Sequence, residues 1–373
     1  RFGLAALRGV AKAPYVIPII KTRINQLAEF SVPQTNPYGL GFRIGLRDSR
    51  KSPTRIEQKE AERLTQLMLN CGDHDNHEQF ARDDLETFMR KIARDSLTLD
   101  AMTFEVVRDR KGRPKEWLAV DGATIFHCTP SNPQDPIAED HAAYVQVIND
   151  QEVAYFSTSD LAYAIRNPST ELSMKGYGQP ELVDLMQTML NLSYASLYNQ
   201  NYFKQGGQKG VLAVMGQMPE RQFESFKRMM VTSTAGVRNA YRLAMVNPQG
   251  AGADIKWVPV GSNNRDMEFS EWINWNYKIA CAVYQIAPEE TGFYYGNEGG
   301  GSAMFEGNQE AKLRMGKSKG LRPFVRFIEK ALNRYIVWEL NPDYSIYFLG
   351  LDTMTEDERA ELDSKRVHST HTF

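Results

Sequence analysis

The first hundred positions of the chain show helical spacing of their apolar residues. Apolar side chains recur every three or four positions over residues 19–30, in a segment after Pro53 and over residues 78–96. This period places the apolar side chains on one face of an α-helix. The stretch 37–49 lacks the period and predicts a loop or a strand. We therefore expect a helical start to the chain.

A different period begins at Met102. From there to residue 166, apolar and polar residues tend to alternate and β-branched and aromatic residues dominate. The turn dipeptides Lys111-Gly112 and Asp121-Gly122 separate successive runs. This region predicts a small, mostly antiparallel sheet that packs on the preceding helices.

Two long segments further along carry very little charge. Residues 179–206 and 265–287 predict helices, and the first has no charged residue from Leu185 to Phe203. The outer side of a surface helix in a soluble monomer normally carries charged residues. The uncharged run is long enough to span a membrane, but its many Asn, Gln and Ser residues argue against a lipid environment. Helices of this kind are therefore expected to be enclosed by copies of the same chain, as in a ring.

The segments between and after these helices differ in character. Residues 208–264 predict a separate α/β insertion with three strands and one helix, and residues 288–303 form a loop rich in glycine and aromatic residues. Residues 304–350 predict a helix that kinks at Gly320 and Pro323. The chain as a whole predicts an α+β fold.

Composition narrows the function classes. The chain has 373 residues, 42% of them hydrophobic and 24% charged, with a formal net charge of −2, so it is not a generally basic nucleic-acid-binding protein. Its three cysteines, Cys71, Cys128 and Cys281, are far apart and indicate a reducing compartment without a disulfide framework. Residue 1 is arginine rather than methionine and residues 351–373 complete no core, so we expect both true chain ends to lie outside this sequence.

Two short segments imitate ligand sites. The sequence CGDHDNHE at 71–78 holds potential metal ligands, but no second Cys or His pair completes a zinc site, and a polar turn is the expected structure. Gly316-Lys317-Ser318 resembles the end of a phosphate-binding loop, but the required earlier glycine is Ala311. We expect no catalytic residue, no metal and no cofactor. An enzyme with a nucleotide or metal site in 71–78 or 296–318 remains the alternative of a different class.

A basic helix begins near Ala311. Up to Arg334 it contains Glu329 as its one acidic residue. Its basic residues are Lys312, Arg314, Lys317, Lys319, Arg322, Arg326, Lys330 and Arg334. Such a helix can attract DNA phosphates, form a solvated face, or contact the acidic residues 57–62 of another subunit.

The order of these elements resembles that of the portal proteins of tailed double-stranded-DNA bacteriophages, from about Tyr15 to Asp357. The resemblance depends on the helix entry Tyr177-Gly178-Gln179-Pro180, on residues 202–207 followed by Gly210-Val211-Leu212, on residues 279–288, and on the hairpin at 108–114. Each motif is short, and their order and spacing together make the resemblance specific.

The resemblance implies a ring, expected to be a dodecamer, at one vertex of the capsid. DNA is pumped through such a ring by a separate terminase and later leaves to the tail. The implied partners are further copies of the chain, double-stranded DNA, the terminase large subunit, a head–tail adaptor and the major capsid protein, with no membrane. The implied location is the virion, after assembly in the host cytoplasm.

The resemblance also assigns the parts of the subunit. These are a wing at 1–175, a first stem helix at 176–207, a clip at 208–264, a second stem helix at 265–287, a tunnel loop at 288–303, a wing helix at 304–350 and the start of a crown at 351–373.

Two sets of site residues follow. The tunnel loop is expected to narrow the channel and repel phosphates through Glu289, Glu290, Thr291, Gly292, Phe293, Tyr294 and Tyr295. The stem is expected to pack, between its helices or between subunits, through Tyr194, Tyr198, Tyr202, Trp272, Trp275 and Tyr284. Another virion structural protein, such as a head–tail connector or capsid subunit, remains the second alternative.

Overall fold

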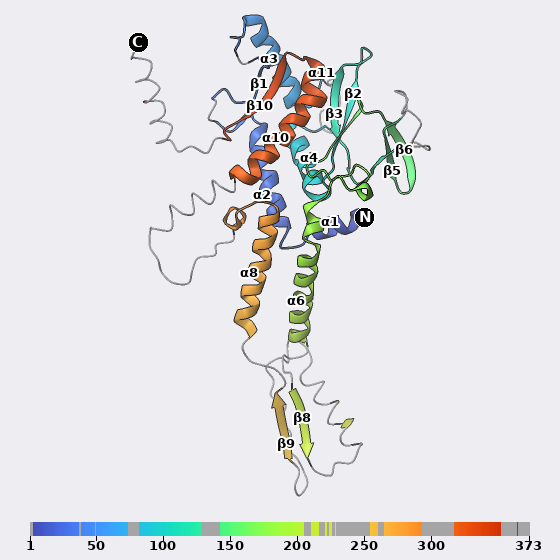
Figure 1. The fold of residues 1–373 in the computed structure, drawn as a ribbon, viewed down its shortest axis with the longest axis vertical. Coiled ribbons are helices and arrows are strands. Elements are labelled where there is room, and N and C mark those ends of the chain that lie inside the picture. The colour runs from blue at the N-terminus through green and yellow to red at the C-terminus, as the bar shows by residue number, and fades with distance from the viewer. Residues whose placement is uncertain are drawn as a thin grey trace. The chain divides into compact units, whose positions relative to one another are not determined.

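The computed structural model divides the chain into two compact units. The first unit is Arg1–Leu185 with Ala280–Phe373, and the second unit is Met186–Ile279 (Figure 1). The structure describes residues 3–36, 39–48, 50–73, 82–128, 142–204, 210–215, 221, 224–225, 228, 254–259, 265–292, 317–351 and 364. The predicted mixture of helix and sheet is confirmed.

Helices open the first unit. They are α1 (Leu4–Ala11), α2 (Ile17–Ala28), the 3₁₀ turn η1 (Glu29–Ser31), α3 (Arg55–Leu69) and α4 (Leu85–Leu99). Thr54 closes a capping box with Glu57 at the start of α3. The helix predicted over 78–96 begins only at Leu85, because the Asp84 carboxylate accepts the backbone N–H of Thr87 at 2.8 Å and caps the helix there.

Two three-stranded antiparallel sheets follow, where a single sheet was predicted. The first has the order β3-β2-β7, from Pro114–Ala119, Met102–Arg108 and Leu161–Ala164. The second has the order β4-β5-β6, from Ile125–His127, Tyr144–Ile148 and Gln151–Phe156. The chain leaves the first sheet after β3 at Gly122, whose N–H is held by the Asp95 carboxylate at 3.0 Å.

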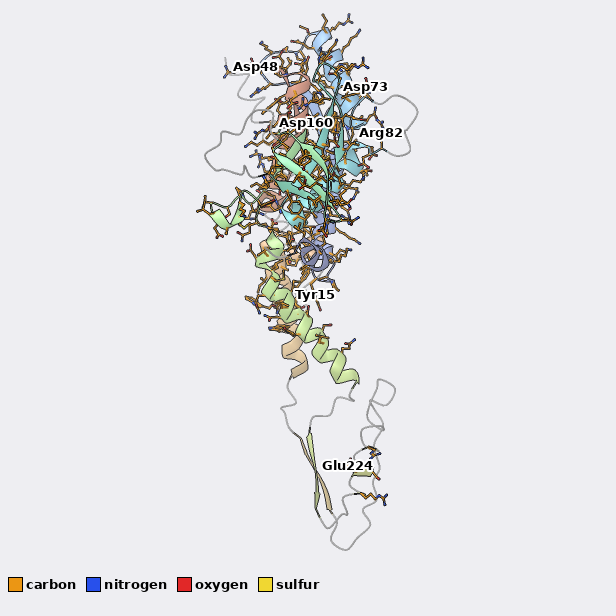
Figure 2. All side chains as sticks on the ribbon, turned by 90° about the vertical axis from the view of Figure 1, so that its right-hand side faces the viewer. Tyr15, Asp48, Asp73, Arg82, Asp160 and Glu224 are labelled. Carbon is orange, nitrogen blue, oxygen red and sulfur yellow. The ribbon has the colours of Figure 1, made fainter. Side chains whose placement is uncertain are left out.

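Side-chain contacts join these layers. The ring of Phe88 on α4 meets the edge of Phe104 on β2, with centroids 5.4 Å apart, so the predicted packing of helices on the sheet is confirmed. The ring of His127 on β4 lies 4.6 Å from that of Tyr163 on β7, which connects the two sheets. Figure 2 labels Asp160, which accepts a hydrogen bond from Arg108 of β2 at 3.3 Å.

A small two-stranded sheet joins opposite ends of the sequence. Strand β1 (Gly41–Leu46) pairs antiparallel with β10 (Tyr344–Leu349). The prediction that residues 304–350 form a helix is therefore wrong at its C-terminal end. The side chain of Asn333 stabilises the strand instead, because it accepts the backbone N–H of Ile346 at 2.8 Å and donates to its carbonyl at 3.0 Å.

The helix before β10 is irregular. It consists of a π turn η7 (Lys317–Leu321), α10 (Arg322–Leu332), a second π turn η8 (Asn333–Val337) and α11 (Trp338–Leu340). The predicted kink at Gly320 and Pro323 coincides with η7 and the first turn of α10.

The two helices that were expected to carry little charge are shorter than predicted, and the second contains five charged residues, Arg265, Asp266, Glu268, Glu271 and Lys278. A 3₁₀ turn η3 (Leu172–Met174) precedes Pro180, which caps the short α5 (Glu181–Asp184), and Leu185 separates α5 from α6 (Met186–Lys204). Helix α8 (Arg265–Val283) ends before 287, because Gln285 has a left-handed backbone with a φ of 52°. The 3₁₀ turn η5 (Pro288–Thr291) follows.

The second unit contains one described strand pair. Strand β8 (Gly210–Met215) pairs antiparallel with β9 (Asp254–Pro259), and the two lie where the first and last strands of the insertion were predicted. The third predicted strand and most of the predicted helix lie outside the described residues. Among the helices that the structure describes, none is long and apolar enough to cross a membrane.

Candidate functional site

A buried arginine on α2 joins several elements of the first unit. The Arg23 side chain is 2% exposed. One terminal nitrogen donates to the side-chain oxygen of Gln26 at 2.8 Å, and the other donates to the backbone carbonyl of Gln285 at 2.6 Å. Burial lowers the pKa of Arg23, and the nearby carboxylate of Glu290 opposes that effect. These contacts fix the turn that follows α8.

Glu290 pairs with this arginine. Its carboxylate lies 3.5 Å from the Arg23 guanidinium and accepts a hydrogen bond from Gln26 at 2.7 Å. Its other oxygen accepts the backbone N–H of Ala287 at 3.2 Å. Glu290 is therefore a buried anchor for η5.

Gly320 completes the cluster from the π turn η7. A Cβ atom at this position would collide with the carbonyl oxygen of Gln285 and the guanidinium of Arg23. Only a glycine lets the chain approach so closely. We call Arg23, Gln26, Gln285, Glu290 and Gly320 the Arg23 junction; it holds the elements that lead into and out of the segment 293–316.

The predicted tunnel-loop residues divide into two groups. The expectation that Glu290 presents a repelling charge is wrong, because its side chain is 3% exposed and paired with Arg23. Thr291 bonds to the carbonyl of Pro288 at 2.6 Å, and Gly292 ends η5 with a φ of 84°. Glu289 is half-buried. The remaining residues, Phe293, Tyr294 and Tyr295, lie outside the described residues.

A second cluster explains the motif before the first charge-poor helix. Asp100 ends α4 with a left-handed backbone, and its carboxylate accepts the N–H groups of Arg166 at 2.8 Å and Asn167 at 2.9 Å. A Cβ at position 178 would collide with that carboxylate. Gly178 is therefore required where the chain passes Asp100 on its way to α5.

A pocket of about 530 Å³ lies beside both clusters. Arg166 and Glu181 form an ion pair in its wall, and Gln285 and Gly320 of the Arg23 junction also line it. Burial raises the pKa of Glu181, and the Arg166 charge opposes the shift. The pocket is thus part of the same charged junction.

Helices α6 and α8 expose apolar side chains. Leu190, Tyr194 and Leu197 lie at helical spacing on α6, and Tyr194 is 66% exposed. On α8, Trp272 and Trp275 lie three positions apart, and Trp275 is 63% exposed. Exposed aromatic residues at such spacing are typical of surfaces that bind another protein.

The remaining predicted stem residues are Tyr198, Tyr202 and Tyr284, of which the structure describes the side chain of Tyr284. Tyr284 lies beyond the end of α8, is buried, and donates a hydrogen bond from its hydroxyl to the carbonyl of Leu97 at 3.0 Å. It belongs to the core of the first unit, so its assignment to stem packing is wrong. The side chains of Tyr198 and Tyr202 lie outside the described residues.

The predicted basic residues are partly described. Lys312 and Arg314 lie outside the described residues, whereas Lys317, Lys319 and Arg326 are exposed and Arg322 is half-buried. Lys317 and Lys319 lie on η7, beside Gly320 of the Arg23 junction. Arg322 and Arg326 lie on α10, which follows η7 directly.

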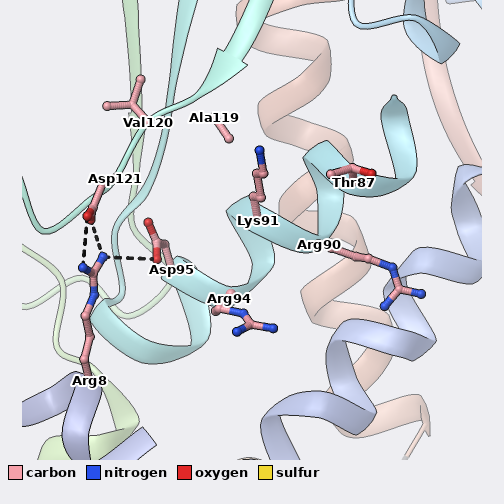
Figure 3. A pocket seen from close by; sticks show the side chains of 9 residues that line it. All are labelled: Arg8, Thr87, Arg90, Lys91, Arg94, Asp95, Ala119, Val120 and Asp121. Carbon is pink, nitrogen blue, oxygen red and sulfur yellow. Dashed lines mark hydrogen bonds and ion pairs between the residues drawn. The ribbon is translucent and has the colours of Figure 1, made fainter. Parts of the chain in front are cut away.

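A further pocket, of about 430 Å³, lies where α1 meets α4. Arg8 of α1 pairs with Asp121 and lies 3.8 Å from the carboxylate of Asp95 on α4, as Figure 3 shows. Lys91 and Arg94 also line the pocket. These charges join α1 to the turn after β3.

The metal-like segment at 71–78 begins with a buried cysteine. Burial raises the pKa of the Cys71 thiol to about 12, which disfavours the thiolate form that binds metals. His74 and His77 lie outside the described residues.

Sequence reasoning missed Arg23 and Asp100. A signal for Arg23 was present, since it shares the apolar face of α2 with Ile20, Ile24 and Leu27. A charged residue on an apolar stripe indicates a buried partner. The partner Glu290 is too distant in sequence to be identified from local spacing.

Comparison with known families assigns the class of protein. The family model described as "Phage portal protein" matches residues 81–370, which is most of the chain. The chain belongs to the phage portal protein family.

Two relatives have similar sequences over nearly the whole chain. It is 33% identical to the "Probable portal protein" of Staphylococcus phage Twort, with 98% of this chain and 64% of the relative covered. It is 31% identical to the "Probable portal protein" of Enterococcus phage phiEF24C, with 92% of this chain and 60% of the relative covered. The chain therefore spans less than two thirds of the length of these relatives.

Solved structures share the fold at low sequence identity. A chain from the neck of an empty gene transfer agent particle aligns with a TM-score of 0.61 and 14% identity, covering 100% of this chain and 91% of that one. A portal protein of the HK97 family from Corynebacterium diphtheriae aligns with a TM-score of 0.51 and 12% identity, covering 95% and 96% of the two chains. The fold is thus that of portal proteins.

Proposed function

We propose that copies of this chain form a ring at one capsid vertex, through which double-stranded DNA is packaged and later ejected. The observation that carries the proposal is the exposed apolar face of α6 and α8 in a chain of the portal family. Side chains such as Tyr194 and Trp275 would be buried against the next copy in a ring. A related fold occurs in a gene transfer agent neck whose structure was computed with C12 symmetry, which supports twelve copies.

The parts of the subunit follow from this role. Helices α6 and α8 form the stem, residues 208–264 the clip, residues 288–303 the tunnel loop, and residues 351–373 the start of the crown. Residues 1–175 and 304–350 form the wing. The grouping of Met186–Ile279 as one compact unit supports the assignment of stem and clip.

The channel is passive in this proposal. Every pairing between a cation and a phosphate adds affinity for DNA, and α6 contains only one cation, Lys204. The Arg23 junction would hold the start of the tunnel loop through Glu290 and would hold the chain again at Gly320, so that residues between these two points can contact DNA. The role is structural, and the pumping would come from a terminase.

The other partners follow from the position of the ring. The clip would meet the terminase and then the head–tail adaptor, and the wing would contact the major capsid protein. Assembly would take place in the host cytoplasm and the ring would remain in the virion.

Electron microscopy of the purified protein tests the proposal. We expect rings with an axial opening, and native mass spectrometry should give one subunit number near twelve. Monomers at the highest attainable concentration would contradict the proposal, and closed shells would indicate a capsid subunit. A ring without an opening wide enough for duplex DNA would exclude the channel.

A further inference from the structure

The helix that begins at Lys317 carries a row of cations on its exposed side. Lys319, Arg326, Lys330 and Arg334 are all exposed. Residues four or seven apart on a helix lie on the same side, and the distance from Lys319 to Arg334 is about 22 Å at 1.5 Å per residue. We call these four residues the basic face.

The one acidic residue within this helix is bonded to β10. Glu329 is the one acid between Lys317 and Arg334 in the sequence. Its carboxylate accepts the backbone N–H of Phe348 at 2.8 Å; burial raises its pKa, and this hydrogen bond and the charge of Arg326 oppose the shift. Within the described part of the chain, Lys317, Lys319 and Lys330 form no ion pair.

Two acidic residues of α3, the helix considered as a contact from another copy, are already bonded within their own chain. On α3, the Glu57 carboxylate already accepts the N–H of Thr54 at 2.7 Å, and Glu60 accepts a hydrogen bond from Arg63 at 2.7 Å. These bonds would have to compete with any contact to a neighbour. Duplex DNA, in contrast, presents one phosphate charge per about 1.7 Å of its axis.

The basic face also contrasts with α6 and α8, which contain few cations. Helix α6 has one cation, Lys204, and α8 has two, Arg265 and Lys278. A surface along which DNA slides should make few phosphate pairs, because each pair adds affinity. A row of four cations is suited to hold DNA in place.

We propose that the basic face binds the phosphate backbone of duplex DNA without regard to sequence and tethers it rather than conducts it. The expectation that the chain meets DNA rests on the proposed function. The binding itself depends only on the charges of α10 and its two π turns.

Removal of three cations tests this proposal. The variant Arg326→Gln/Lys330→Gln/Arg334→Gln of the full chain is titrated with a short duplex by fluorescence anisotropy from low to physiological salt. Three lost phosphate contacts should make the log–log salt dependence less steep by about 2.7 and weaken binding at physiological salt about tenfold or more. Dissociation should become faster, and duplexes of unrelated sequence should respond alike.

A matched control removes the same charge elsewhere. Lys51 precedes α3, Arg55 and Lys59 lie in its first two turns, and all three are exposed. The variant Lys51→Gln/Arg55→Gln/Lys59→Gln should bind DNA within about twofold of the unchanged chain. Equal thermal unfolding of both variants confirms that they fold.

Two outcomes would overturn the proposal. In the first, the basic-face variant binds DNA as tightly as the control. In the second, it binds DNA normally but no longer self-associates in native mass spectrometry, which would make the face a contact between copies. If the unchanged chain forms no rings but still binds DNA in a salt-dependent way, the proposed ring is contradicted and this inference stands.

Discussion

Asp95 on α4 is a half-buried carboxylic acid whose raised pKa brings its titration towards neutral pH. Burial raises its pKa from 3.8 to about 6, and the neighbouring Asp121 adds to the shift, whereas the N–H of Gly122 and the charges of Arg8 and Arg94 oppose it. The folded chain therefore holds the proton more tightly than the unfolded chain. The contribution of Asp95 to stability is complete below pH 3.8 and is lost as the pH rises through about 6.

The variant Asp95→Asn should remove this loss of stability at higher pH. We expect it to match the unchanged chain near pH 4 and to exceed it in free energy of unfolding by at most roughly 3 kcal/mol above pH 7. Urea unfolding at several pH values measures the difference. The variant Asp48→Asn, at an exposed carboxylate, should leave the pH profile unchanged, and parallel profiles for both variants would show that Asp95 does not titrate as described.

The buried ion pair of Glu290 and Arg23 should make a large contribution to the stability of the fold. Truncation by Glu290→Ala leaves the buried Arg23 guanidinium without its carboxylate, which should cost about 3–5 kcal/mol of unfolding free energy. The exposed pair of Glu60 and Arg63 provides the control, and Glu60→Ala should cost less than about 1 kcal/mol. Similar losses in urea unfolding for the two variants would contradict the role of Glu290 as a buried anchor.

At the scale of elements, the start of α10 depends on its close approach to the turn after α8. The variant Gly320→Ala places a Cβ against the Gln285 carbonyl and the Arg23 guanidinium, which should cost about 1–3 kcal/mol. Hydrogen exchange should quicken in α10. The variant Gly9→Ala in α1 meets no atom within 4 Å and should be neutral or stabilising, and equal effects of the two changes would argue against the close contact.

At the scale of the whole molecule, the exposed faces of α6 and α8 predict how copies associate. The variant Tyr194→Ser/Trp275→Ser removes apolar area that a ring would bury, so rings should dissociate at concentrations about tenfold or more higher than for the unchanged chain. Native mass spectrometry measures the ring fraction against concentration. Tyr155 on β6 is 60% exposed, and Tyr155→Ser is the matched control; intact rings for the stem variant would contradict the proposed interface.

Much of the fold could be predicted from local patterns. The helices α2 and α3 and the strands β2 to β6 lie where periodicity predicts them, because each pattern is complete within a few residues. The motif at Tyr177-Gly178-Gln179-Pro180 was also recognisable, although the reason for Gly178 appears only in the collision that a side chain would make with Asp100.

The sequence by itself determined the periods of helix and strand, the scarcity of charge on α6, and the membership of the portal family. The tertiary structure alone decided the pairing of β1 with β10, the burial of Glu290 against Arg23 and the place of Tyr284 in the core. The physical reason is the distance along the chain between the residues that interact. Periodicity reflects neighbours along one element, whereas a strand partner or a buried ion pair depends on which distant segments the whole chain brings together as it buries its apolar surface.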